Sequence, residues 1–95
     1  MPVKKMQCII DGRNISSMEA FYGELKRQLS FPSHFGNNLD ALWDVLTTDI
    51  EGPVQIVWNG AEVSRRNMGN DFETAVALLR KVGKERKDFH VTIHE

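Results

Sequence analysis

The first third of the chain changes from a strand-like to a helix-like pattern of apolar side chains. Residues 3–10 form a short run rich in apolar residues that stops at a turn signal, which predicts a strand. Residues 17–29 then place apolar side chains at helical spacing, which predicts an amphipathic helix. Ser16, with Glu19 three residues later, fits a capping box, so we expect the helix to begin there.

The second half of the chain contains two further strand patterns with a helix between them. Residues 54–58 are a β-branched run that predicts a buried strand, and residues 89–93 predict another. Residues 59–70 contain three Asn and two Gly and are expected to form a loop with room for one helical turn. We expect a helix capped by Asp71 to follow and to end near Gly83. The resulting order β-α-α-β-α-β favours a small parallel sheet of the α/β class.

Size and composition are those of one globular domain, expected to cover residues 1–95. Hydrophobic residues make up 41% and charged residues 26%, an ordinary balance that excludes a disordered or collagen-like chain. The single Cys8 cannot close an internal disulfide. No apolar run is long enough for a signal peptide or a membrane span. We therefore expect a cytoplasmic protein that is monomeric when free and does not bind membranes.

Charge is divided unevenly along the chain, although the formal net charge is only −1. Residues 28–64 contain five acidic residues and no Lys or Arg, which gives −5. Residues 65–95 contain seven basic and five acidic residues, which gives +2. The pI of about 6.3 and the lack of aromatic residues among the C-terminal bases argue against nucleic-acid binding. An acidic platform for a basic partner and a merely solvated acidic surface both remain open.

Residues 32–47 carry the candidate chemistry. Gly36 permits a positive φ, and Asn37 or Asn38 can cap a helix that follows. At about 100° per residue, Asp40 and Asp44 lie on one side of this helix and the apolar residues on the other. Trp43 lies at the boundary between the two sides, and Thr47 lies on the acidic side. The apolar arc consists of Leu39, Leu42, Val45 and Leu46.

The residues alone leave three interpretations of this helix. The two carboxylates could form a solvated face, a partner-binding face or a metal site. In the last case His34 would join Asp40 and Asp44 as a two-carboxylate, one-histidine site of a small metal-dependent hydrolase. The chain contains none of the common phosphate, dinucleotide or zinc-protease motifs, which favours a binding protein with no catalytic residues and no cofactor.

The run from Gly36 to Asp44, GNNLDALWD, strongly resembles the barstar family of bacterial intracellular inhibitors of secreted ribonucleases such as barnase. Weaker similarity covers the whole chain. The resemblance implies a three-layer α/β domain with a three-stranded parallel sheet and no enzymatic activity. It also implies a 1:1 complex in which the second helix and its preceding loop occlude the active site of a basic, extracellular-type ribonuclease.

The resemblance also implies roles for individual residues. Asp44 would be the central anchor, placed where the substrate phosphate binds, and Asp40 would add a second carboxylate. Tyr is typical of the family at the position of His34, and the acidic side chain of the family's last helix is missing near Lys81 or Gly83. A different basic protein therefore remains an alternative target. The residues expected to contact the partner are His34, Gly36, Asn38, Asp40, Trp43, Asp44 and Thr47.

Overall fold

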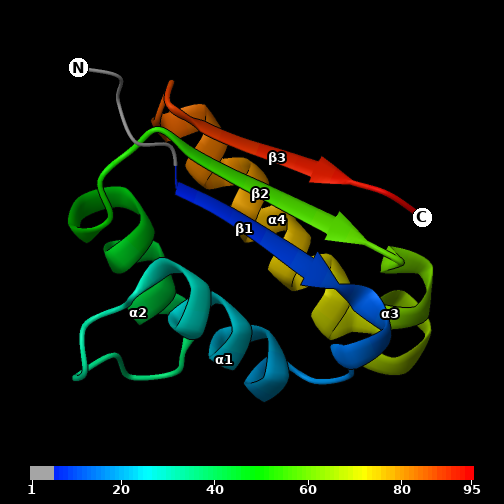
Figure 1. Cartoon of the computed structure of the whole chain (residues 1–95). Coiled ribbons are helices and arrows are strands. Elements are labelled where there is room, and N and C mark those ends of the chain that lie inside the picture. The colour runs from blue at the N-terminus through cyan, green and yellow to red at the C-terminus, as the bar shows by residue number, and fades with distance from the viewer. Residues whose placement is uncertain (1–5) are drawn as a thin grey trace.

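The computed structural model describes residues 6–95. Its main elements follow the expected order along the chain, with one additional helix between the second and third strands (Figure 1). A 3-10 turn over Gly12–Asn14 follows the first strand, and a π-helical turn over Val45–Asp49 continues the second helix. The main elements are β1 (Met6–Asp11), α1 (Met18–Leu29), α2 (Leu39–Asp44), β2 (Val54–Asn59), α3 (Ala61–Met68), α4 (Asn70–Glu85) and β3 (Phe89–Ile93).

The three strands form one parallel sheet in the order β1-β2-β3. Met6 pairs with Val54, which in turn pairs with Phe89, so the strands start almost level. The predicted α/β class and parallel sheet are therefore confirmed. Residues 3–5, which the sequence also assigned to the first strand, lie outside the described residues.

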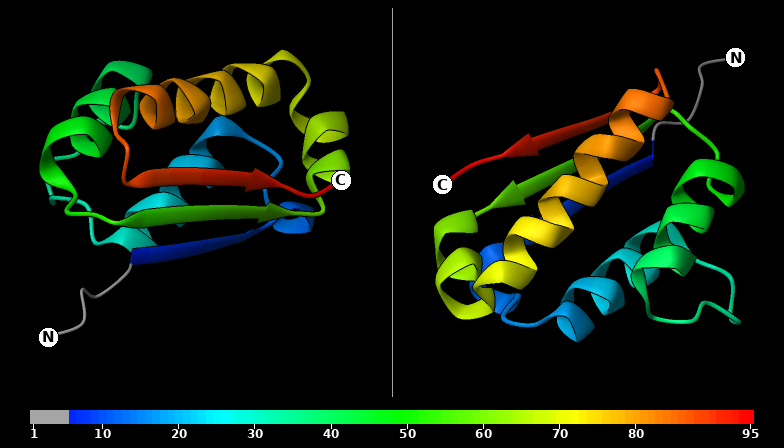
Figure 2. Two further views of the ribbon diagram at one scale, coloured as in Figure 1. Left: turned by 90° about the horizontal axis from the view of Figure 1, so that it is seen from above. Right: turned by 180° about the vertical axis from the view of Figure 1, so that it is seen from behind.

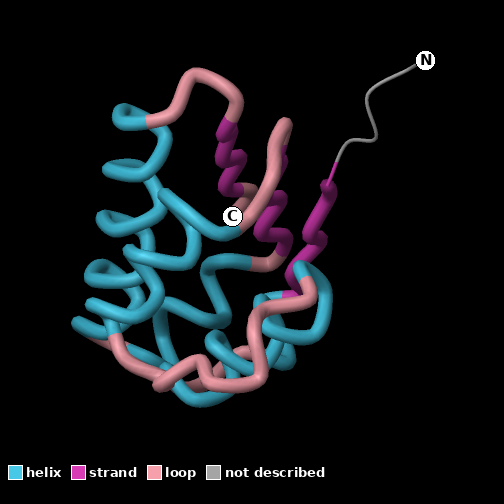
Figure 3. Tube along the Cα trace, turned by 90° about the vertical axis from the view of Figure 1, so that its left-hand side faces the viewer, coloured by secondary structure: helices cyan, strands magenta, loops and turns pink. Residues whose placement is uncertain are grey.

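The helices lie on one face of the sheet, so residues 6–95 form two layers and not the expected three (Figures 2 and 3). Cys8, Ile10 and Ile56 point into the helical layer and are fully buried. Gln7 and His90 are exposed on the opposite face. Crossovers between parallel strands share one hand, so a sheet whose strands follow the chain order carries all its helices on one face.

The core centres on Trp58, which is fully buried near the end of β2. Its ring stacks on Phe21 with centroids 5.3 Å apart and meets Phe72 edge-on at 5.2 Å. The indole N–H donates to the Ser64 hydroxyl at 3.1 Å, and that hydroxyl donates to the Gly12 carbonyl at 2.7 Å. The indole N–H and the buried hydroxyl thus both have hydrogen-bond partners. Together, the contacts of Trp58 with Phe21, Ser64 and Phe72 tie α1, α3 and α4 to the sheet.

Two predicted helix caps and one predicted loop were wrong. Ser17, not Ser16, caps α1, because its hydroxyl accepts a hydrogen bond from the Ala20 N–H at 3.1 Å. The expected loop at residues 59–70 contains α3, whose buried side chains recur at helical spacing. The α4 helix begins at Asn70, so Asp71 lies in its first turn and does not cap it, whereas its end at Glu85 is near Gly83 as predicted. Within residues 6–95, no helix combines the length and apolarity needed to cross a membrane.

The outer edge of β1 is covered by a side chain from α1. The Gln28 carboxamide accepts a hydrogen bond from the Ile9 N–H at 2.9 Å and donates one to the Ile9 carbonyl at 2.8 Å. Gln28 therefore satisfies both backbone groups that Ile9 would otherwise present to a neighbouring strand.

The Cys8 thiol should not react while the protein is folded. Burial, with a smaller contribution from the Glu24 carboxylate, raises its pKa from 9.0 to about 12. The thiolate, which is the nucleophile, is therefore scarce at neutral pH. Because the folded state holds this proton more tightly, the thiol's contribution to stability is present below pH 9.0 and is lost as the pH rises toward about 12.

The measurement is the rate at which a disulfide reagent labels the protein at about pH 8, with and without denaturant. We expect labelling only after unfolding. Equal rates for the folded and unfolded chains would contradict the buried, protonated thiol.

Candidate partner-binding surface

The start of α2 is fixed by the side chain of Asn38. Its carboxamide oxygen accepts a hydrogen bond from the Ala41 N–H at 2.8 Å, and its amide group donates to the Gly36 carbonyl at 3.2 Å. The positive φ expected at Gly36 occurs instead at Asn37, with φ of 51°. Asn is one of the few residues besides Gly that tolerate this conformation. Gly36 and Asn38 therefore shape the entry to the helix.

The loop before α2 is anchored by two aromatic side chains that the sequence analysis did not single out. Phe31 and Phe35 are buried, and their rings meet edge-on with centroids 4.9 Å apart. Phe35 also contacts Tyr22 of α1 edge-on at 5.9 Å. His34 lies in the turn between the two phenylalanines and is exposed. The spacing of two aromatic residues four apart around a Pro-Ser turn is the sequence signal that could have identified this anchor.

The end of α2 passes into the π-helical turn, where threonine side chains bond back to the helix. The Thr47 hydroxyl donates to the Trp43 carbonyl at 2.6 Å, and the Thr48 hydroxyl donates to the Asp44 carbonyl. Thr47 is half-buried. Its hydroxyl hydrogen is thus used within the helix, which leaves an acceptor oxygen for a partner.

Asp40 and Asp44 project from the exposed side of α2, as the helical periodicity predicts. Both are exposed, whereas Leu42 and Leu46 on the opposite side are fully buried. Within residues 6–95, neither carboxylate takes part in an ion pair. The helix therefore presents two uncompensated negative charges one turn apart on a base that is packed into the core.

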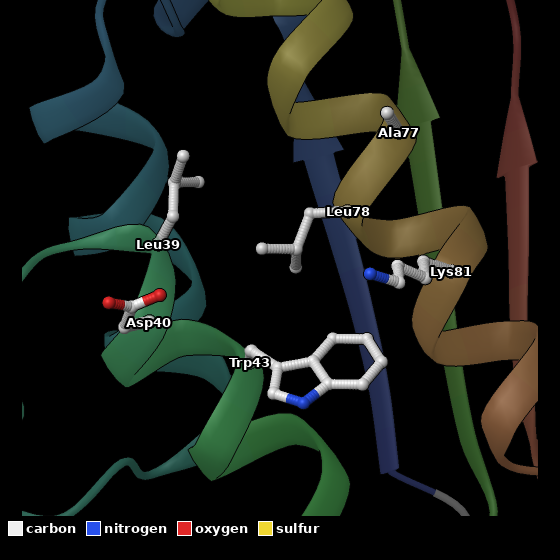
Figure 4. A pocket seen from close by; sticks show the side chains of 6 residues that line it. All are labelled: Leu39, Asp40, Trp43, Ala77, Leu78 and Lys81. Atoms are coloured by element: carbon white, nitrogen blue, oxygen red, sulfur yellow. The ribbon is translucent and has the colours of Figure 1, made fainter.

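A hollow of about 330 Å³ lies beside the acidic face, between α2 and α4. Figure 4 shows Asp40 and Trp43 on the α2 side and Lys81 extending from α4 toward the Trp43 ring. The Lys81 ammonium lies 5.3 Å from the centroid of that ring, within the range of a cation–π interaction. Trp43 is half-buried, so its side chain remains partly accessible. The remaining lining residues are Leu39, Ala77 and Leu78.

The predicted alternative of a metal-dependent hydrolase is not supported by the geometry. Among residues 6–95, no three side chains of the His, Cys, Asp and Glu types lie close enough together to hold a metal ion. His34, Asp40 and Asp44 therefore do not form the site that this alternative requires. What the structure brings together is a helix with two free carboxylates, a partly accessible indole and an anchored loop at its start.

This arrangement suits recognition of a cationic surface. A carboxylate on a rigid helix can accept paired, charge-assisted hydrogen bonds from guanidinium or ammonium groups. The Asn38 cap and the buried leucines fix the helix before any partner arrives, so little ordering remains to be done on binding.

Comparison with known proteins gives an independent indication. A family model described as "Barstar (barnase inhibitor)" matches residues 5–94 of the chain. A protein of Bacillus subtilis (strain 168) described as "Putative ribonuclease inhibitor YrdF" is 36% identical to the chain over 80 residues. Those residues cover 84% of this chain and 88% of that protein. The family match includes α2 and the loop before it.

Proposed function

Because the chain belongs to the barstar family, we propose that it inhibits a barnase-like ribonuclease inside the cell by covering the nuclease active site with α2 and the preceding loop. Family membership itself makes the chain a ribonuclease inhibitor and not an enzyme, in agreement with the sequence analysis. The nature of the target, the mode of occlusion and the residues involved are our proposal.

The single observation that carries the proposal is the pair of unpaired carboxylates on α2. Asp40 and Asp44 are exposed, without an ion-pair partner within residues 6–95, on a helix whose other face is core. A ribonuclease stabilises a negatively charged phosphoryl transition state, so its active site gathers cationic groups. Two carboxylates held at a fixed spacing complement such a cluster and take the place of substrate phosphate.

The residues around the carboxylates have supporting roles in this proposal. Asp44 is the central anchor, and Asp40 pairs with a second cation. The Trp43 ring packs against the partner at the side of the hollow, and Thr47 offers its acceptor oxygen. The loop before the helix contributes His34, Gly36 and Asn38.

One feature favours the alternative of a different basic partner. Lys81 carries a positive charge beside Trp43, at the edge of the otherwise acidic face. A partner that is basic along its whole contact surface would meet like charge there, which opposes binding. Under this alternative, the partner is a protein that is basic opposite Asp40 and Asp44 but not opposite Lys81.

The direct test is titration of the purified chain into a barnase-like ribonuclease while RNA cleavage is followed with a fluorogenic substrate. We expect cleavage to stop at one equivalent of inhibitor and the two proteins to elute as a 1:1 complex in size-exclusion chromatography. Unchanged cleavage at a large excess of the chain would contradict inhibition of this class of nuclease. A complex that still cleaves RNA would contradict occlusion of the active site.

A further inference from the structure

A single arginine joins the end of α4 to the end of the acidic helix. The Arg86 guanidinium donates through Nη1 to the carbonyls of Leu46 at 2.7 Å and Ile50 at 2.8 Å. Through Nε and Nη2 it donates to the two carboxylate oxygens of Asp88, both at 2.9 Å. The Arg86 side chain is only 14% exposed. Its contacts therefore reach 40 residues back along the chain to the π-helical turn and 36 residues back to the residue that follows the turn.

The two carbonyls bound by Arg86 need an external partner. The last carbonyls of any helix find no N–H donor within the helix. They must be satisfied by a cap, by water or by tertiary contacts. The α2 helix has only six residues, and the π-helical turn adds five. Segments of this length are marginal in isolation, so their geometry depends on tertiary contacts. Arg86 supplies such a contact at the end opposite the Asn38 cap.

The surroundings of Arg86 are shaped for this contact. Asp88 holds the guanidinium in a bidentate pair, and this arginine holds the pKa of the Asp88 carboxyl below its ordinary value of 3.8. Gly52 provides the necessary room. A Cβ at that position would lie 1.9 Å from Asp88 Oδ2 and 2.6 Å from Arg86 Nη2. The Arg86–Asp88 pair, Gly52 and the two carbonyls thus pack closely together, with the guanidinium hydrogen-bonded to the carboxylate and to both carbonyls.

We propose that Arg86 is a positioning residue for the inhibitory surface, which fixes the C-terminal end of α2 so that Asp40 and Asp44 are held in place before the partner binds. The effect of Arg86 on affinity rests on the proposed function, but the effect of Arg86 on α2 is a property of the free protein. Lysine cannot replace it, because one ammonium group cannot reach two carbonyls and a bidentate carboxylate with a fixed fork. The guanidinium thus acts from outside the interface.

The test compares Arg86→Gln with Arg13→Gln as a matched control. Arg13 also forms a bidentate pair with an aspartate two residues away, Asp11, but its side chain is 76% exposed and, within residues 6–95, donates no hydrogen bond to a backbone carbonyl. Amide hydrogen exchange is measured on the free proteins, and association and dissociation rates are measured with the barnase-like ribonuclease.

In Arg86→Gln we expect exchange at residues 45–50 to speed up about tenfold relative to the sheet, and dissociation of the complex to speed up about tenfold. Arg13→Gln should change neither quantity. Arg86→Lys, which keeps the charge, should behave like Arg86→Gln. Should Arg86→Gln fail to fold, Asp88→Asn, which removes only the orienting carboxylate, is measured in its place with the same expectations in a weaker form.

Each outcome decides one of the two proposals. Unchanged exchange at residues 45–50 overturns the positioning role, whatever the nuclease does. Faster exchange with unchanged dissociation also overturns it, because the end of α2 would then not matter for binding. Failure of the wild-type chain to bind the nuclease overturns the proposed function, and exchange in the free protein then decides whether Arg86 fixes α2.

Discussion

Replacing Asp44 with alanine is expected to weaken binding to the ribonuclease by about 2–5 kcal/mol or more, mainly through faster dissociation. This is the general range for truncating one partner of a buried charge pair, and measurements on the barnase–barstar complex are among those behind it. In the complex the change leaves cationic groups of the nuclease buried without their counter-ion. Removal of one partner from such a pair costs more than the pair itself contributes, because the remaining charge is desolvated and unpaired. Asp40→Ala should show a smaller loss of the same kind.

The same substitution should leave the fold intact or slightly more stable. Asp44 is exposed, and within residues 6–95 it has no ion-pair partner, so truncation removes no core packing. Alanine is the better helix former by up to about 0.7 kcal/mol, and repulsion from Asp40 disappears. Weak binding in a well-folded protein is therefore the expected signature.

The measurement pairs calorimetric affinity with thermal melts. Glu62→Ala is the matched control, because it removes one exposed carboxylate from α3, where its only ion pair in the described residues is a surface contact of 3.5 Å with Arg66. We expect the control to bind as the wild type does. If Asp44→Ala binds as tightly as the wild type, or melts far below it, then the acidic side of α2 is not the inhibitory surface.

Replacing Leu42 with alanine should give the opposite signature. Leu42 is fully buried on the inner side of α2. Its truncation removes apolar contacts and leaves a cavity, which lowers the free energy of unfolding by roughly 2–5 kcal/mol. For a domain of this size each kcal/mol corresponds to a fall in Tm of about 4–8 °C. Binding should suffer only to the extent that the protein unfolds.

Chemical denaturation and calorimetry at low temperature test this expectation together. Under conditions where Leu42→Ala is still folded, its affinity for the ribonuclease should lie close to that of the wild type. A large loss of affinity in a fully folded Leu42→Ala protein would mean that the inner and outer sides of α2 do not act separately. A stability equal to that of the wild type would contradict the packing of α2 described here.

The sequence predicted the acidic helix well because helical periodicity is a local property. Asp40 and Asp44 fall on one side and Leu42 on the other whatever surrounds the helix. The α3 helix was missed because its flanking Asn and Gly residues favour loops by composition. Burial of Ala61 and Met68 against the rest of the fold outweighs that tendency.

Other features depend on contacts that no local pattern contains. The number of layers follows from the strand order, which is set when β1 and β3 pair on either side of β2. The contact between Arg86 and the carbonyls at the end of the acidic helix joins segments 36 and 40 residues apart. In the sequence Arg86 is one more base in a charged segment, and only the fold gives it a specific partner.

The Gln28 side chain that covers Ile9 also limits how copies of this protein can associate. Growth of a sheet into a fibre by edge-to-edge addition requires two open edges in every molecule, one to receive a strand and one to offer the next. Within residues 6–95, the Gln28 carboxamide occupies the middle of the outer edge of β1, so β3 is the edge that remains for strand addition. Strand addition confined to the β3 edge joins two molecules but leaves no edge for a third.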